Sequence, residues 1–218
     1  QAVLANKADY GVALDGDGDR LMMVDRTGRV FDGDSLIYVI AKARAQADKL
    51  QGGVVGTVMT NLAMEIALKE RGIEFVRAKV GDRYVLEQLY QRGWQVGGEA
   101  SGHILCMDKH NTGDGIISAL QVFAALGELG VDLSNVLSDW QAYPQTMINV
   151  RINKGHEWQP AAEPVLKQVE QALGQQGRVV LRASGTEPVV RVMVEAKDAS
   201  VAKASAEKIA AAIEASIH

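Results

Sequence analysis

The sequence predicts an α/β fold: a βαβ domain with a mostly parallel mixed sheet, followed by a smaller α+β domain. Three observations indicate this. Short apolar strand candidates alternate with helix candidates over about the first two thirds of the chain, which is typical of βαβ units. After Pro144 the order of elements changes to β-α-β-β-α, which suits a small domain with antiparallel strands. The 218 residues are 47% hydrophobic and 23% charged, as in globular proteins with a sizeable core.

The first part of the chain opens with a helix end and a group of strands. Residues 1–5 resemble the last turn of a helix, and residues 10–14 are apolar enough for a short strand. Residues 21–25 and 29–31 are predicted to form a hairpin, because Gly28 lies in the turn between them.

Helices and strands then alternate. Asp34 or Ser35 is the expected N-cap of a helix that continues to about Lys49. The further strands of this part are expected at residues 53–59, 73–78 and 94–97, and its further helices at residues 61–71, 84–92 and 115–129.

The second part has shorter connections between its strands. Its strands are expected at residues 147–153, 178–184 and 189–196, and its helices at residues 160–173 and 199–217. Since the pattern changes after Pro144, we expect the domain boundary near residue 141.

Composition excludes several classes of protein. Cys106 is the only cysteine, so a disulfide scaffold is impossible and a reducing cytoplasm is the expected location. The net charge is −4 and no basic stripe is present, which argues against a nucleic-acid partner. No apolar run reaches the roughly 18 residues that span a membrane, and we expect no signal peptide, because the opening residues lack an apolar run of that kind. The chain does not begin with Met, and we expect it to be part of a longer protein.

The first candidate site is the acidic loop DGDGDR at residues 15–20. Its glycines permit a curl that would bring Asp15, Asp17 and Asp19 together, and converging carboxylates suit a hard cation such as Mg²⁺. An EF-hand does not fit, because Arg20 and Arg26 stand where that motif needs Gly and Glu. A haloacid-dehalogenase nucleophile loop fits better, but Asp19 takes the place of its Thr or Val. An acidic turn without a ligand is the remaining alternative.

The second candidate site is GGEASGH at residues 97–103, directly after a predicted strand. Glu99 and Ser101 offer an acceptor and a hydroxyl to sugar oxygens, and His103 can carry a proton near neutral pH. Taken alone, a His after Gly in such a segment is more often an ordinary hydrogen-bonded loop residue than a catalytic one.

The third candidate site is RASGTEP at residues 182–188, between two predicted strands. A guanidinium, two hydroxyls and a glycine can form a phosphate cradle, although the segment is not a Walker A loop. A hairpin turn with the same residues for conformational reasons is the alternative.

Together and in this order, the three loops resemble those of the α-D-phosphohexomutase family. The acidic loop resembles its metal-binding loop, the second its sugar-binding loop and the third its phosphate-binding loop. Three further segments are similar to the branch that acts on glucosamine 6-phosphate: AKVGDRYV (78–85), DKHNTGDGI (108–116) and RVMVEA (191–196).

The resemblance implies an enzyme of four domains. A phosphoserine in the first domain gives its phosphoryl group to a hexose phosphate, which becomes a bisphosphate. This intermediate reorients in the site and then returns its other phosphoryl group to the serine. In this branch glucosamine 6-phosphate becomes glucosamine 1-phosphate, which feeds UDP-N-acetylglucosamine and cell-wall synthesis. The chain would comprise the end of domain 2 with the metal loop (1–33), a sugar-binding domain 3 (34–141) and a phosphate-binding domain 4 (142–218).

The resemblance also implies roles for individual residues. Asp15, Asp17 and Asp19 would hold Mg²⁺, Arg20 would lie beside the transferring phosphoryl group, and His103 would be a general acid/base. Glu99 and Ser101 would bind sugar hydroxyls, and the non-reacting phosphate would be held by Arg182, Ser184, Gly185 and Thr186. Three residues of another glycine-containing loop would line the same cleft or be ordinary surface charges: Lys79, Asp82 and Arg83.

One feature of the family is absent from the sequence. No serine is followed by His-Asn-Pro, as in the family's phosphoserine motif. We therefore expect the chain to be inactive alone and to need two partners, a phosphorylated hexosamine and an N-terminal phosphoserine domain of the same protein; a homodimer stays open. The alternatives are a phosphomannomutase or phosphoglucomutase, a Mg²⁺-dependent phosphatase, and a non-catalytic sugar-phosphate-binding fragment.

Overall fold

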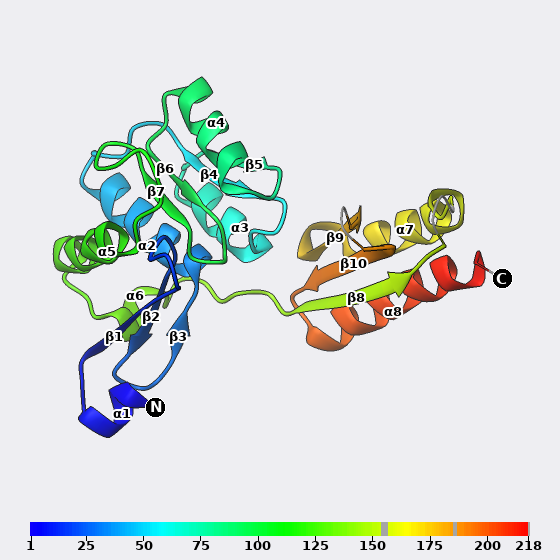
Figure 1. Ribbon diagram of the computed structural model, residues 1–218, viewed down its shortest axis with the longest axis horizontal. Coiled ribbons are helices and arrows are strands. Elements are labelled where there is room, and N and C mark those ends of the chain that lie inside the picture. Colours follow the sequence, from blue (N-terminus) through cyan, green and yellow to red (C-terminus); the bar gives the residue numbers. More distant parts are fainter. Residues whose placement is uncertain (154–156, 185–186, 218) are drawn as a thin grey trace. The chain divides into compact units, whose positions relative to one another are not determined.

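A computed structural model of the chain describes residues 1–153, 157–184 and 187–217. The chain divides into two compact units, Gln1–Gln141 and Ala142–His218, which are described separately (Figure 1). The predicted α/β class and the predicted order of elements are confirmed. No helix of the described part is long and apolar enough to cross a membrane.

The first unit opens with a three-stranded antiparallel sheet in the order β1-β2-β3. A short helix, α1 (Ala2–Asn6), precedes the strands β1 (Tyr10–Leu14), β2 (Leu21–Asp25) and β3 (Val30–Phe31). Leu14 pairs with Leu21, so the acidic loop is the connection of the β1-β2 hairpin.

The main sheet of the first unit has four strands in the order β5-β4-β6-β7. Strand β4 is parallel to β5 and β6, whereas β7 is antiparallel to β6, so the sheet is mixed as predicted. Its strands are β4 (Val54–Thr57), β5 (Phe75–Ala78), β6 (Val96–Gly98) and β7 (Ile104–Cys106).

Helices surround this sheet. Helices α2 and α5 contact each other and contact β6 and β7 respectively, while α4 contacts β4, β5 and β6. The helices are α2 (Gly33–Gln46), α3 (Leu62–Glu70), α4 (Asp82–Arg92), α5 (Gly115–Leu129) and α6 (Leu133–Val136). Helix α2 is the most enclosed, with buried side chains all around it, since it also contacts β2, β3 and α3.

The prediction for the start of α2 is wrong. Asp32, and not Asp34 or Ser35, is the N-cap: its carboxylate accepts a hydrogen bond from the Ser35 amide at 2.9 Å. Asp34 is instead buried and accepts a hydrogen bond from the amide of Asn61 at 2.8 Å, so it joins the starts of α2 and α3.

The second unit is a three-stranded antiparallel sheet in the order β8-β10-β9, with α8 packed on β8 and β10 and α7 packed on β9. Val190, Val192 and Val194 alternate along β10 and are fully buried in a core that includes Ile209 and Ile213 of α8. The elements are β8 (Gln145–Arg151), α7 (Gln159–Leu173), a single 3₁₀ turn η1 (Gly174–Gln176), β9 (Gly177–Ala183), β10 (Val189–Ala196) and α8 (Ala199–Ala215).

Candidate metal and sugar-phosphate site

The acidic loop brings its three aspartates together. One carboxylate oxygen from each of Asp15, Asp17 and Asp19 lies within 4.8 Å of the other two. Gly18 adopts a left-handed backbone, with φ of 74°, which a residue with a side chain adopts at a cost. The loop therefore has the curl that converging ligands require.

Arg20 partly balances the charge of this cluster. Its amide donates a hydrogen bond to Asp15 Oδ1 at 3.1 Å, and its Nε lies 3.7 Å from Asp15 Oδ2 and 3.9 Å from Asp19 Oδ1. Partial desolvation raises the pKa of Asp15, but the hydrogen bond from the Arg20 amide and the Arg20 charge favour the charged carboxylate, and the net shift of its pKa is downward. Asp15 is thus held in its charged, ligating form.

Asp19 has one oxygen that lacks a hydrogen bond. Within the described part of the chain, its Oδ1 is buried and accepts no hydrogen bond; the Arg20 Nε, at 3.9 Å, is beyond hydrogen-bond distance. A buried carboxylate oxygen without a donor is costly unless a cation faces it. The loop offers three carboxylates as metal ligands, and one of their oxygens, Asp19 Oδ1, has no hydrogen bond within the described residues. This arrangement fits a hard divalent cation.

The sugar-loop candidate lies against the acidic loop. Arg20 and His103 form an antiparallel β-bridge, and the amide of Leu21 donates to the carbonyl of Gly102 at 3.0 Å. Gly102 has φ of 96°, and a Cβ there would lie 2.3 Å from the Leu21 carbonyl oxygen, so only glycine permits this approach. Residues far apart in sequence thus form one site in the first unit.

His103 connects the two loops through its side chain. Its side chain is 8% exposed, and its Nδ1 lies 3.1 Å from Asp19 Oδ2. Its role as a general acid/base stays a prediction.

The segment at residues 79–83 lies beside the same site through Glu99; the prediction of a loop here is wrong for Asp82 and Arg83, which begin α4. Glu99 Oε1 accepts a hydrogen bond from the amide of Gly81 at 2.8 Å. Lys79, Asp82 and Arg83 are exposed, as is Ser101 of the sugar loop. Both cationic groups of this loop lie over the ring of Tyr84, the Lys79 Nζ at 5.7 Å and the Arg83 guanidinium at 5.3 Å.

The phosphate-loop candidate belongs to the second unit. Arg182 lies on β9 directly across from Arg191 of β10, so both side chains leave the same face of the sheet. The Ser184 amide donates to the Val189 carbonyl at 2.8 Å, and Ser184 Oγ accepts from the Glu187 amide at 3.3 Å. The two remaining predicted residues, Gly185 and Thr186, lie outside the described residues.

Three residues that lie beside the predicted loops, two in the first unit and one in the second, have no role predicted from the sequence. A Cβ at Gly113 would lie 2.3–2.7 Å from the His103 ring, so this glycine lies directly against the imidazole. The amide of Gly115, at the start of α5, donates to the Gly18 carbonyl at 2.9 Å. Arg191 faces Arg182. The segments DKHNTGDGI and RVMVEA contain these residues, but only long-range pairing reveals what they contact.

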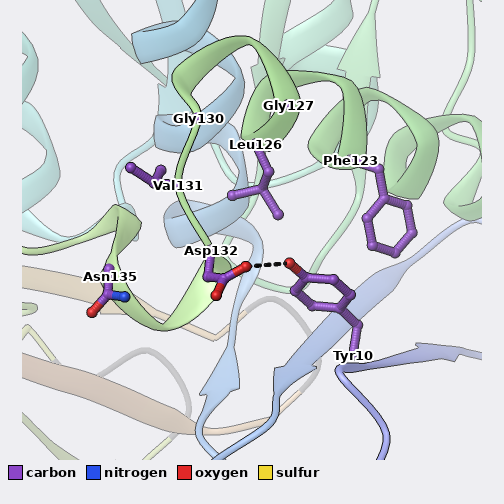
Figure 2. Close-up of a pocket in the computed structure, with 8 residues that line it drawn as sticks. All are labelled: Tyr10, Phe123, Leu126, Gly127, Gly130, Val131, Asp132 and Asn135. Atoms are coloured by element: carbon purple, nitrogen blue, oxygen red, sulfur yellow. Dashed lines mark hydrogen bonds between the residues drawn. The ribbon is translucent and has the colours of Figure 1, made fainter.

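A cavity of about 620 Å³ lies at the other end of β1, between that strand and the end of α5 (Figure 2). The Tyr10 hydroxyl donates to Asp132 Oδ1 at 3.0 Å, and the rings of Tyr10 and Phe123 pack edge to face with their centroids 5.4 Å apart (Figure 2). Arg26 pairs with the same Asp132 at 3.2 Å. Because its charged group already has two partners, this cavity is a weaker candidate than the acidic loop.

Comparisons with known proteins define the class. The family description "Phosphoglucomutase/phosphomannomutase, alpha/beta/alpha domain III" matches residues 32–143, and "Phosphoglucomutase/phosphomannomutase, C-terminal domain" matches residues 147–212. The chain therefore belongs to the phosphoglucomutase/phosphomannomutase family, the α-D-phosphohexomutases, and the predicted resemblance is confirmed.

The curated relatives are more specific. The chain is 76% identical to the phosphoglucosamine mutase of Neisseria subflava over 212 residues, which are 97% of this chain and 48% of that protein. It is 66% identical to the phosphoglucosamine mutase of Chromobacterium violaceum over 98% of this chain and 48% of that protein. The chain thus spans about half the length of the curated relatives it matches.

Solved structures share the fold. An Aspergillus fumigatus N-acetylphosphoglucosamine mutase, described in complex with GlcNAc-6P and magnesium, matches 96% of this chain and 49% of its own with a TM-score of 0.79 and 24% identity. A phosphoglucomutase/phosphomannomutase family protein from Burkholderia thailandensis matches 99% of this chain and 49% of its own with a TM-score of 0.75 and 21% identity.

Proposed function

We propose that the chain is the cation- and sugar-phosphate-binding part of a phosphoglucosamine mutase. The whole enzyme interconverts glucosamine 6-phosphate and glucosamine 1-phosphate through a phosphoserine and a bisphosphate intermediate. The observation that carries the proposal is the junction of the acidic loop with the sugar loop, where three converging carboxylates lie beside His103. The identity of 66–76% to phosphoglucosamine mutases favours the amino sugar as substrate.

Asp15, Asp17 and Asp19 would hold Mg²⁺. Carboxylate oxygens are the ligands that this ion prefers, and the buried, unbonded Asp19 Oδ1 is explained by a cation. When bound, Mg²⁺ would offset negative charge on the transferring phosphoryl group. The Aspergillus fumigatus enzyme is described with magnesium and GlcNAc-6P, which supports this choice of ion and the class of ligand.

The residues around the cation would position the reacting groups. The Arg20 side chain is 55% exposed, so its guanidinium can bind a phosphoryl oxygen while its backbone stays fixed by the bridge to His103. Phosphoryl transfer depends mainly on such positioning and on neutralisation of charge.

The sugar would bind along the second loop. Glu99 Oε1 is fixed by the Gly81 amide, which leaves Oε2 to accept from a sugar hydroxyl. The exposed Ser101 hydroxyl provides a second polar contact, and Lys79, Asp82 and Arg83 extend the polar surface.

The second unit would bind the phosphate that does not react. Arg182 and Ser184 supply a guanidinium and a hydroxyl at the end of β9, and Gly185 and Thr186 complete the proposed set. The rest of the enzyme, with its phosphoserine, would come from the half of the relatives' length that this chain does not span. The alternative within the family is a phosphomannomutase or phosphoglucomutase, which the family description names.

The proposal is tested with a polypeptide that joins this chain to the N-terminal half of the relatives. Initial rates are measured with Mg²⁺ and a bisphosphate primer for the 6-phosphates of glucosamine, mannose and glucose. We expect preference for glucosamine 6-phosphate, and no turnover by the 218-residue chain alone. Preference for the 6-phosphate of mannose or glucose would show that the proposed substrate is wrong, while the proposed mutase mechanism would stand. Turnover by the chain alone would contradict the assignment of the phosphoserine to the missing half.

A further inference from the structure

The helices of the second unit cover only one face of its sheet. Val190 and Val194 of β10 lie in the core to which both α7 and α8 contribute, so both helices pack on that face. Side chains alternate along a strand, and Arg191 therefore lies on the opposite face, which is called the open face below. The burial along β8 agrees, since alternate residues from Gln145 to Arg151 are exposed and those between them are partly or fully buried.

Three arginines from three strands gather at one end of the open face. Arg182 of β9 lies directly across from Arg191 of β10. Arg151, the last residue of β8, lies across from Val189, two residues from Arg191 along β10. Diagonal neighbours of this kind have Cα atoms about 7–8 Å apart, which long side chains can bridge. The three guanidinium groups therefore form one basic cluster.

The charges of this cluster are not balanced by the protein. Among the described residues, the side chains of Arg151 and Arg182 form no ion pair or hydrogen bond, and Arg191 only approaches Glu187, at 3.7 Å. At the other end of the open face, by contrast, Arg178 is paired with the buried Glu195. Like charges on neighbouring strands destabilise a sheet, and a bound anion would offset that repulsion.

We propose that Arg151 is a further phosphate-binding residue of the second unit and contacts the dianionic phosphate of the sugar phosphate together with Arg182. The proposal deepens the proposed function and rests on it, because it requires the second unit to bind a phosphate. A phosphate monoester presents several acceptor oxygens, and guanidinium groups on separate strands can bind different oxygens of the same group. Arg151 is exposed at the end of its strand, so its side chain is available to a ligand.

The test titrates the ¹⁵N-labelled 218-residue chain with glucosamine 6-phosphate and follows the amide signals of the second unit by nuclear magnetic resonance. We expect Arg151→Gln to weaken binding at least about fivefold, because a charge-assisted hydrogen bond to phosphate is lost. Arg151→Lys keeps the charge and is expected to weaken binding less than the glutamine variant. Glucosamine without phosphate is expected to leave the signals of the second unit unchanged.

A matched control removes the same charge from the helical side of the second unit. Lys203 of α8 is 70% exposed and lies 3.9 Å from Glu207, and α8 packs on the face opposite to the basic cluster. Lys203→Gln is therefore expected to keep the native affinity. Without ligand, the melting temperature of Arg151→Gln should stay the same or rise, since one of three like charges is removed.

The outcomes separate this proposal from the proposed function. Native affinity in Arg151→Gln, or an equal loss in Lys203→Gln, would overturn the role of Arg151 while phosphate binding by the second unit stands. Loss of affinity together with a lower melting temperature would assign Arg151 to the fold and overturn its binding role. If glucosamine 6-phosphate moves no signal of the second unit in the native chain, the phosphate site itself is overturned, and this proposal with it.

Discussion

Asp17 is one of the two exposed members of the acidic cluster, with Asp15. It approaches Asp15 and Asp19 through the curl of the loop, yet it lies outside the core of the first unit. Its main contribution is therefore negative charge and one ligand oxygen. A substitution at this position should change cation affinity without destabilising the fold.

Asp17→Asn is expected to lower Mn²⁺ affinity at least about tenfold, because ligand charge strongly tunes the affinity of carboxylate sites. The melting temperature without metal should stay the same or rise slightly, since one repulsive charge is removed. Asp9→Asn is the control: its carboxylate is 74% exposed and pairs with Arg26 at 3.2 Å, away from the cluster. Titration calorimetry measures both variants, and equal affinities would contradict the assigned ligand.

At the scale of elements, strands and helices with a periodic apolar pattern were predicted well. The strands at residues 10–14 and 189–196 and the helix at residues 115–129 lie where the sequence places them, because each has a full set of apolar positions at the period of its element. Strand β7 has three residues and α6 four, which is too short for any period to show.

Only some of the contacts between residues of the candidate site could be predicted from the sequence. The curl of the acidic loop follows from its glycines and aspartates. The contact of Asp19 with His103 and of Gly113 with the His103 ring depends on pairing between distant segments, which no local pattern encodes. The N-cap of α2 was missed for a related reason: Asp34 has capping chemistry, but it serves the start of another helix.

A polar cluster joins α2, α3 and the last segment of the first unit. The Tyr38 hydroxyl donates to Asp139 Oδ2 at 2.6 Å and accepts from Arg71 Nε at 2.8 Å, and Arg71 also pairs with Asp139. Lys42 donates to the same Asp139 oxygen at 3.0 Å. The cluster therefore holds the segment that precedes the second unit against two helices.

Tyr38→Phe is expected to lower the free energy of unfolding of the first unit by about 1–3 kcal/mol, because the buried Tyr38 loses the hydroxyl that connects Arg71 and Asp139. Tyr90→Phe is the control, since Tyr90 is 62% exposed and should change stability by less than about 0.5 kcal/mol. Urea unfolding measures the difference, and equal midpoints for the two variants would contradict this account of the cluster.

The same cluster predicts sensitivity to acid. Burial raises the pKa of Asp139, but hydrogen bonds from Tyr38, Arg71 and Lys42 outweigh it and lower the pKa to about 2. Since the folded pKa lies below the unfolded one, about 3.9, the contribution to stability is present above that value and is lost as the pH falls toward 2. Asp139→Asn should flatten the loss of stability between about pH 4 and pH 2; an unchanged slope in that window would argue against this pairing.

At the scale of the whole molecule, the two units have separate cores. In the second unit, Glu195 is fully buried and accepts hydrogen bonds from Arg178 and Gln145, one partner on each neighbouring strand. This ion pair stabilises the sheet of the second unit only.

Glu195→Ala is expected to destabilise the second unit by about 3–5 kcal/mol, because it leaves the mostly buried Arg178 without its carboxylate. Hydrogen exchange followed by mass spectrometry should show faster exchange in β8, β9 and β10 and native protection in α2 and α5. Uniform loss of protection over both units would show that they unfold as one.

We propose that the whole protein, of which this chain spans about half, transfers phosphoryl groups within a hexosamine phosphate rather than releasing them. The most direct measurement is ³¹P nuclear magnetic resonance of glucosamine 6-phosphate incubated with Mg²⁺, a bisphosphate primer and the polypeptide that carries both halves. The account predicts that the 1-phosphate signal grows to an equilibrium level while inorganic phosphate stays absent, and that Asp17→Asn slows its growth. Inorganic phosphate without the 1-phosphate would contradict the account and identify the acidic loop as that of a phosphatase.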